Sequence, residues 1–141
     1  AEISLGDSSS NNILSVGNYG TQELKYYSGG TISTGTGKPS WGVNESVASA
    51  VTTGLTTDLE KWYHVELTIV DGKGTLTVTQ KDDSTNTKTV SDIEITSTNI
   101  QYIRAGVGKI TGSNGTTTNM QISLDNIQVA KYTPTSTSET E

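Results

Sequence analysis

Residues 62–80 of this chain read WYHVELTIVDGKGTLTVTQ, which is the clearest structural signal in the sequence. In the first half of this stretch the apolar side chains recur at every second position, and they are Tyr63, Val65, Leu67 and Ile69. Successive side chains of a strand point to opposite sides, so this alternation predicts a strand with one buried face. The Asp-Gly-Lys-Gly sequence at 71–74 predicts a turn, and residues 75–80 form a second strand with Leu76 and Val78 toward the core. The stretch therefore predicts a β-hairpin.

Shorter alternating runs recur along the chain. Their positions are 12–16, 22–27, 87–95, 100–107 and 120–129, and residues 81–86 read as a polar turn. The last run changes phase between Leu124 and Ile127, so we expect a bulge at Asp125 and Asn126 that keeps both apolar sets facing inward. No helical period is sustained, because the weak candidate at 45–59 contains Gly54 and several threonines. About nine short strands predict an all-β, antiparallel two-sheet β-sandwich of the jelly-roll kind.

Length and composition indicate how the chain is organised. A chain of 141 residues suits one domain with a single core, and its 30% of hydrophobic residues fit strands with a Thr-rich solvent face. We assign the sandwich domain to residues 1–132. Residues 133–141, TPTSTSETE, read as a Thr/Ser/Pro linker tail to another module. Because residues 1–5 already alternate, we expect the chain to begin inside a strand, with a segment missing upstream.

Charge and hydropathy exclude several classes of function. The net charge of −6 argues against nucleic-acid binding, which needs a basic stripe to meet the phosphates. No apolar stretch approaches the roughly 20 residues that span a bilayer. The absence of cysteine excludes a disulfide framework and thiolate zinc sites, and it leaves the compartment open.

Two stretches resemble a known group of domains. Residues 61–69, KWYHVELTI, with the hairpin that follows, resemble the central strand pair of laminin-G-like and concanavalin-like jelly rolls. Residues 123–129, SLDNIQV, resemble the closing strand of carbohydrate-binding modules attached to bacterial glycan-degrading enzymes. The resemblance covers most of residues 1–132. It implies a secreted or cell-surface β-sandwich that binds polysaccharide, and such folds have an additional N-terminal strand that we expect this chain to lack.

Catalysis has little support in the sequence. His64 is the only histidine and alternates onto the polar face of its strand, and there is no cysteine nucleophile. Asp92 and Glu94 are two apart on a predicted strand, about 6.5–7 Å between Cα atoms, and paired carboxylates are what glycoside hydrolysis requires. However, the third carboxylate of the jelly-roll hydrolase motif is replaced by Thr96. We predict that the domain is not an enzyme.

Asp125 is the best candidate for a metal ligand. The resemblance implies that an aspartate of the closing strand binds a structural calcium together with oxygens from the first strand. Calcium takes six to eight oxygen ligands, and Asp7, Ser8 or Glu2 could add some of them. Alternatively, Asp125 and its neighbour cap the bulge by hydrogen bonds to local backbone. The acidic loop 82–86 raises the same question more weakly.

The aromatic residues carry the prediction of sugar binding, because the C–H face of a sugar stacks on Trp or Tyr rings. The chain has two Trp, six Tyr and no Phe. Trp41 lies in the Gly- and Pro-rich loop 36–42 and is the first candidate, although a loop Trp can also fold back onto the sandwich edge. Trp62, by contrast, is expected to pack under a loop. The complete set of predicted ligand residues is Trp41, Tyr26, Tyr27, Lys25, Lys38, Tyr102 and Arg104.

Two functional hypotheses follow from these residues. The first is a non-catalytic carbohydrate-binding module that targets an appended enzyme to a plant polysaccharide; its lysines and arginine would suit an acidic glycan such as pectin. Its partners would be the polysaccharide and the appended catalytic or anchoring modules. The second is a structural or adhesive β-sandwich domain of a bacterial cell-surface protein, without a small-ligand site. The first requires exposed aromatic rings beside polar groups, whereas the second predicts that these rings are buried.

Overall fold

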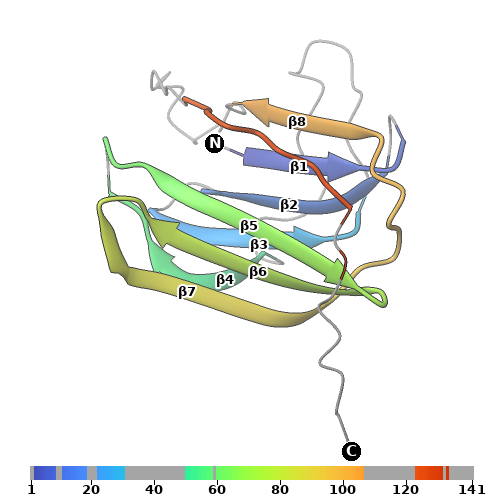
Figure 1. Cartoon of the computed structure of the whole chain (residues 1–141), viewed down its shortest axis with the longest axis horizontal. Coiled ribbons are helices and arrows are strands. Elements are labelled where there is room, and N and C mark those ends of the chain that lie inside the picture. The colour runs from blue at the N-terminus through green and yellow to red at the C-terminus, as the bar shows by residue number, and fades with distance from the viewer. Residues whose placement is uncertain are drawn as a thin grey trace, which may run out of the picture.

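The regular structure of this chain is all β, arranged as two antiparallel sheets that face each other (Figure 1). The computed structural model describes residues 2–8, 11–18, 22–30, 50–58, 60–106, 123–131 and 133. Within these ranges the strands are β1 (Glu2–Gly6), β2 (Asn12–Asn18), β3 (Glu23–Ser28), β4 (Val51–Thr56), β5 (Tyr63–Val70), β6 (Lys73–Gln80), β7 (Asp83–Glu94) and β8 (Tyr102–Gly106). No helix capable of crossing a membrane occurs in those ranges.

The five-stranded sheet has the order β4-β3-β2-β1-β8, and the three-stranded sheet has the order β5-β6-β7. All paired strands are antiparallel. This arrangement confirms the predicted two-sheet β-sandwich, while the jelly-roll connectivity stays a prediction. Residues 134–141 lie outside the described residues, so the domain boundary and the linker tail stay predictions as well.

The hairpin of β5 and β6 is the most regular part of the sandwich. Asp71 and Gly72 both have positive φ, 50° and 74°, which is the backbone of a two-residue type I′ turn. The predicted hairpin is therefore confirmed, with a turn of two residues where we expected four. The lysine at 73 already pairs with Val70, so the alternation of β6 starts earlier than the sequence indicated.

β7 is longer than predicted, because the turn that precedes it contains only Lys81 and Asp82. The prediction of a polar turn over 81–86 was wrong in its extent, since threonine-rich polar sequence also suits the solvent face of a strand. β7 carries a bulge: the pairing shifts by one residue between Gly74 and Leu76 of β6, and Asp92 has a φ of 58°. The bulge changes the phase of β7, so that its second half turns Ile93 into the core.

The core lies between the sheets and draws on both. Its buried members are Ile13, Leu14, Val16, Leu24, Leu55, Leu76, Val78, Ile93 and Ile95. Leu76 and Val78 are completely buried, as the alternation of β6 predicted. Burying such a side chain contributes about 1.5–3 kcal/mol, so this cluster is the main source of stability. Tyr63 is half-buried against it, which agrees with its assignment to the apolar face of β5.

Two sequence-based predictions were wrong, and one strand was missed. Residues 51–56 form strand β4, although the sequence showed only a weak, broken helical candidate there; Gly54, with a φ of 80°, interrupts the pattern. Residues 123–130 belong to neither sheet, and the side chains of Leu124, Ile127 and Val129 are exposed, so the expected closing strand is absent in this range. Asn126 does have a positive φ of 53° at the expected irregularity. Trp62 is exposed rather than packed under a loop.

Candidate functional site

One face of the five-stranded sheet gathers side chains from strands far apart in the sequence. Arg104 lies opposite Ser4, Ser4 lies opposite Ser15, and Ser15 lies opposite Tyr27. Directly opposed residues of an antiparallel pair share a face, so this row crosses β8, β1, β2 and β3 on one side of the sheet. We call this side the outer face. Residues of the opposite phase, such as Leu14, pack in the core.

Two further predicted ligand residues share the outer face. Lys25 is opposite Gly17, which in turn is opposite Glu2. Tyr102 is opposite Gly6, which lies two residues along β1 from Ser4. With strands about 4.7–4.9 Å apart, the row from β8 to β3 is about 14–15 Å wide. The predicted ligand residues that the outer face brings together are Lys25, Tyr27, Tyr102 and Arg104.

The middle of the outer face is a buried network of hydrogen bonds. Ser4 Oγ donates to Glu2 Oε1 at 2.6 Å, and Ser15 Oγ lies 2.9 Å from Ser4 Oγ and 2.8 Å from Asn12 Oδ1. Asn12 Nδ2 donates to the carbonyl oxygen of Gly29 at 2.7 Å. Buried polar groups that find partners in this way avoid a penalty of about 1–3 kcal/mol each. The network therefore ties β1 to β2 and to the end of β3.

Sequence reasoning missed this network. Serine and asparagine within alternating strands read as solvent-facing residues, and nothing in the local pattern shows which neighbours they meet. Only the register of β1 against β2 places Ser4 beside Ser15.

The two margins of the outer face differ. On β8, the Tyr102 ring is 42% exposed and the Arg104 guanidinium carbon lies 4.9 Å from the ring centroid, which is cation–π distance. On β3, Tyr27 is buried, only 6% exposed, and half-buried Lys25 lies 3.7 Å from a carboxylate oxygen of Glu23. The accessible ring of this face is therefore the one on β8. Two other predicted ligand residues, Trp41 and Lys38, lie outside the described residues.

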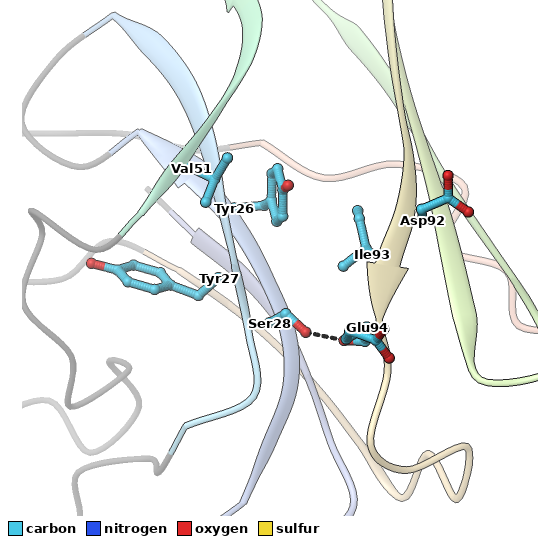
Figure 2. A pocket seen from close by; sticks show the side chains of 7 residues that line it. All are labelled: Tyr26, Tyr27, Ser28, Val51, Asp92, Ile93 and Glu94. Carbon is cyan, nitrogen blue, oxygen red and sulfur yellow. Dashed lines mark hydrogen bonds between the residues drawn. The ribbon is translucent and has the colours of Figure 1, made fainter.

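Tyr26 faces the opposite way from Tyr27 and reaches a cavity between the sheets (Figure 2). The cavity has a volume of about 470 Å³, and it is lined by Tyr26, Tyr27, Ser28, Val51, Asp92, Ile93 and Glu94. The Tyr26 ring and Ile93 point toward each other across the gap, and the Ser28 hydroxyl donates to the backbone oxygen of Glu94. Tyr26 also packs against the core. Its ring therefore joins the two sheets and is separate from the outer face.

The two carboxylates considered for catalysis do not converge on this cavity. Asp92 sits at the bulge of β7, and its carboxylate points away from Tyr26 (Figure 2). The Glu94 carboxylate forms an ion pair with the Lys73 ammonium on the surface of the three-stranded sheet. His64 is likewise exposed, with Nε2 3.7 Å from Glu66 Oε2. The described residues therefore offer no arrangement of nucleophile, acid and base from which a reaction can be derived.

The candidate calcium ligands are not assembled in the described part of the chain. Within it, no group of three or more His, Asp or Glu side chains could hold a metal ion. Among the described residues the buried Asp7 Oδ1 has no hydrogen-bond partner, and an oxygen of this kind can bind a cation, whereas Asp125 is exposed. Since calcium needs six to eight oxygens, these two residues alone do not form its site. A structural calcium stays a prediction.

The acidic loop after β6 is held by local interactions. Lys61 Nζ donates to Asp82 Oδ2 at 2.6 Å, and Gln80 donates to the other oxygen at the same distance. The hydrogen bond from Lys61 is the main reason that the pKa of Asp82 lies below its ordinary value. Asp83 Oδ1 accepts from the hydroxyl and backbone amide of Thr85, and these bonds also lower the pKa of Asp83. These interactions hold the turn at residues 81–82 and the start of β7.

Comparisons of the chain with protein-family models, with curated proteins and with solved structures found no significant match. The evidence on function is therefore the geometry of the outer face.

Proposed function

We propose that this domain binds a polysaccharide without catalysis, through the outer face of the five-stranded sheet. The observation that carries the proposal is the strand register, which brings Lys25 and Tyr27 of β3 onto the same face as Tyr102 and Arg104 of β8. The two residues of β3 are separated from the two of β8 by more than seventy positions in the chain, so local sequence does not explain their alignment. Because the middle of this face is buried, a glycan would meet it at its margins, above all at Tyr102, which is 42% exposed.

Three of the margin residues differ in what they contribute to the proposed site. The exposed ring of Tyr102 offers an apolar surface to the C–H face of a sugar. Arg104 is held against that ring, and its planar guanidinium can donate two parallel hydrogen bonds to a carboxylate. Lys25, across the sheet, forms an ion pair with Glu23, which balances its charge at that margin. The cation on β8, Arg104, favours an acidic glycan, one that contains uronic acid, such as pectin.

The buried network gives the proposed site a rigid floor. In the middle of the face the Ser15 hydroxyl donates a hydrogen bond to the Ser4 hydroxyl, and this bond fixes β1 against β2. Fixing these strands also fixes the distance between Arg104 and Tyr27, which lie at the two ends of the same row. Binding residues on a rigid sheet lose little entropy when a ligand binds.

The proposal extends to the setting of the domain. We place it in a secreted or cell-surface protein, attached through the tail to a catalytic or anchoring module that it holds near the polysaccharide. Trp41 and Lys38 remain proposed ligand residues on the loop 36–42, and Tyr26 remains one at the cavity.

A second candidate function is a structural or adhesive domain without a small-ligand site. The observation that favours it is the burial of Tyr27 and of the network residues Ser4 and Ser15, all at most 6% exposed. If the whole outer face serves as packing, the four margin residues stabilise the fold and bind no glycan.

Affinity electrophoresis in gels that contain soluble polysaccharides separates the two candidates. We expect polygalacturonate to retard the wild-type chain more than a neutral glucan does, and we expect Tyr102→Ala and Arg104→Ala to reduce this retardation. Lys81→Ala is the matched control, since it removes one positive charge from an exposed turn of the other sheet. A wild-type chain that migrates unchanged in every glycan would reject the binding function in favour of the structural one.

A further inference from the structure

The four edge strands of the sandwich differ in how they are protected against pairing with another chain. In the part of the chain that the structure describes, β7 carries a bulge at Asp92, and its exposed Lys88 lies opposite Val78 with its side chain beside Gly54 of β4. β4 has a positive φ at Gly54 and an irregular register with β3. β8 is only five residues long and carries Arg104. Bulges, lysine side chains and short length are the usual devices that protect sheet edges.

β5 has none of these devices. It pairs with β6 over eight consecutive residues without a register shift, and it contains no proline, glycine or lysine. β6 is its only partner among the described residues, so one side of β5 presents a regular row of backbone N–H and C=O groups. Such a row is a template for one more strand.

We propose that the edge of β5 pairs with β5 of a second copy of this chain. The two strands run antiparallel about a two-fold axis at Val65, and they join two three-stranded sheets into one continuous sheet. Two-fold contacts of this kind are self-complementary, because the same surface serves both partners.

The charge pattern selects this register. His64 and Glu66 flank Val65 and point to the same side of β5, with His64 Nε2 3.7 Å from Glu66 Oε2. A two-fold axis at Val65 places each His64 opposite Glu66 of the second copy. A slip of one residue would set inward side chains against outward ones. A slip of two residues would set Glu66 against Glu66, or His64 against His64. An imidazole N–H can donate to a carboxylate across the strands, whereas two carboxylates set opposite each other repel.

The apolar side of β5 supports the same pairing. Val65 is 37% exposed although it belongs to the inward phase of the strand, opposite the fully buried Val78. In the proposed dimer it contacts Val65 of the second copy, and Tyr63 lies opposite Leu67. The dimer thereby buries apolar surface that is exposed to solvent in the single chain.

The alternative occupant of this edge is the segment 123–130 of the same chain. Its apolar residues, Leu124, Ile127 and Val129, are exposed. However, Asn126 has a φ of 53° in the middle of the segment, which interrupts a regular ladder. A second β5 has no such interruption, and therefore it fits an edge of eight regular residues better.

Disulfide trapping tests the proposed register directly, since the chain has no native cysteine. Opposed residues of antiparallel strands have Cα atoms about 4.5–5.5 Å apart, within the range that a disulfide requires. We expect Val65→Cys to form a covalent dimer under mild oxidation. The control Thr87→Cys, exposed on the protected strand β7, should remain a single chain. Equal cross-linking of the two variants would overturn the proposal.

Sedimentation of uncross-linked chains provides the second measurement, which does not depend on a cysteine at a core-facing position. Wild type should associate to twice its mass of 14.9 kDa as concentration rises. Glu66→Lys should raise the dissociation constant about tenfold or more, because a lysine offers no acceptor to the imidazole N–H and both cross-strand pairs are lost. Adding His64→Glu to that variant sets opposite charges against each other in this register and should restore the dimer.

Two further results would overturn the proposal. One is a wild-type chain that stays monomeric at every concentration, without disulfide trapping at Val65. The other is a monomer in which hydrogen exchange protects both β5 and residues 123–130, which would assign the edge to the chain's own segment.

Discussion

Truncation of Leu76 to alanine should lower the free energy of unfolding by about 3 kcal/mol, within the range of about 2–5 kcal/mol for buried leucines. Leu76 has no exposed surface and lies on the central strand of the three-stranded sheet, between Leu67 of β5 and Val90 of β7. Neighbours on both sides are held by strand pairing, so they cannot move in to fill the space that the truncation leaves. The cavity therefore remains, and the cost includes lost contacts as well as lost burial.

The matched control is Leu124→Ala, which makes the same chemical change on a side chain that is 41% exposed and outside both sheets. We expect it to change the free energy of unfolding by less than about 0.5 kcal/mol, as for surface substitutions in general. Urea unfolding followed by far-UV circular dichroism and by Trp fluorescence measures both variants. For a domain of this size, 3 kcal/mol corresponds to a fall in Tm of about 10 °C.

The two leucines together test where the core lies. If Leu124→Ala destabilises the chain as strongly as Leu76→Ala, the segment 123–130 packs in the core in solution, and the placement of the core between two sheets alone is wrong. If neither variant is destabilised, the cluster around Leu76 is not the source of stability.

Three other substitutions test separate parts of the structure. Gly74→Ala should destabilise the chain by about 1–3 kcal/mol, because its Cβ would lie 3.1 Å from Ile95 Cγ1 in a packed core; an unchanged urea midpoint would contradict this. Ser15→Ala removes the centre of the buried network and should cost about 1–3 kcal/mol, measured in the same way, and no loss would mean that the network is dispensable. Asp82→Asn should change the pH dependence of Tm. The folded pKa of Asp82 is lowered, chiefly by the hydrogen bond from Lys61, so its contribution to stability is present above the ordinary value of 3.8 and is lost as the pH falls through the lowered value. The Tm difference between wild type and Asp82→Asn should therefore shrink in acid, and a constant difference from neutral pH to strong acid would refute the assignment.

Local pattern was a reliable guide where strands are long and one-sided. The alternation over residues 62–80 predicted β5, β6 and the buried positions Leu76 and Val78, because the side-chain period of a strand is a local property. Local pattern gave the wrong prediction where the polar face of a strand and a turn have the same composition. Thr85 and its neighbours read as a turn, yet they extend β7, since threonine suits both places. Gly54 concealed β4 for the opposite reason, because a glycine inside a strand resembles a break.

The closing segment shows a second limit of pattern. Leu124, Ile127 and Val129 have the spacing of a bulged strand, but a strand also needs a partner to accept its hydrogen bonds, and residues 123–130 pair with neither sheet. The sequence states which side chains would share a face. It does not state which edge is free to receive them.

The sequence by itself determined the class of this protein: an antiparallel, all-β sandwich whose central hairpin buries Leu76 and Val78. The grouping of Lys25 and Tyr27 with Arg104, which underlies the proposed binding face, was decided by tertiary structure alone. Alternation depends only on neighbours along the chain, whereas this grouping depends on the hydrogen-bond register of β8, β1, β2 and β3, which join residues that are remote in sequence.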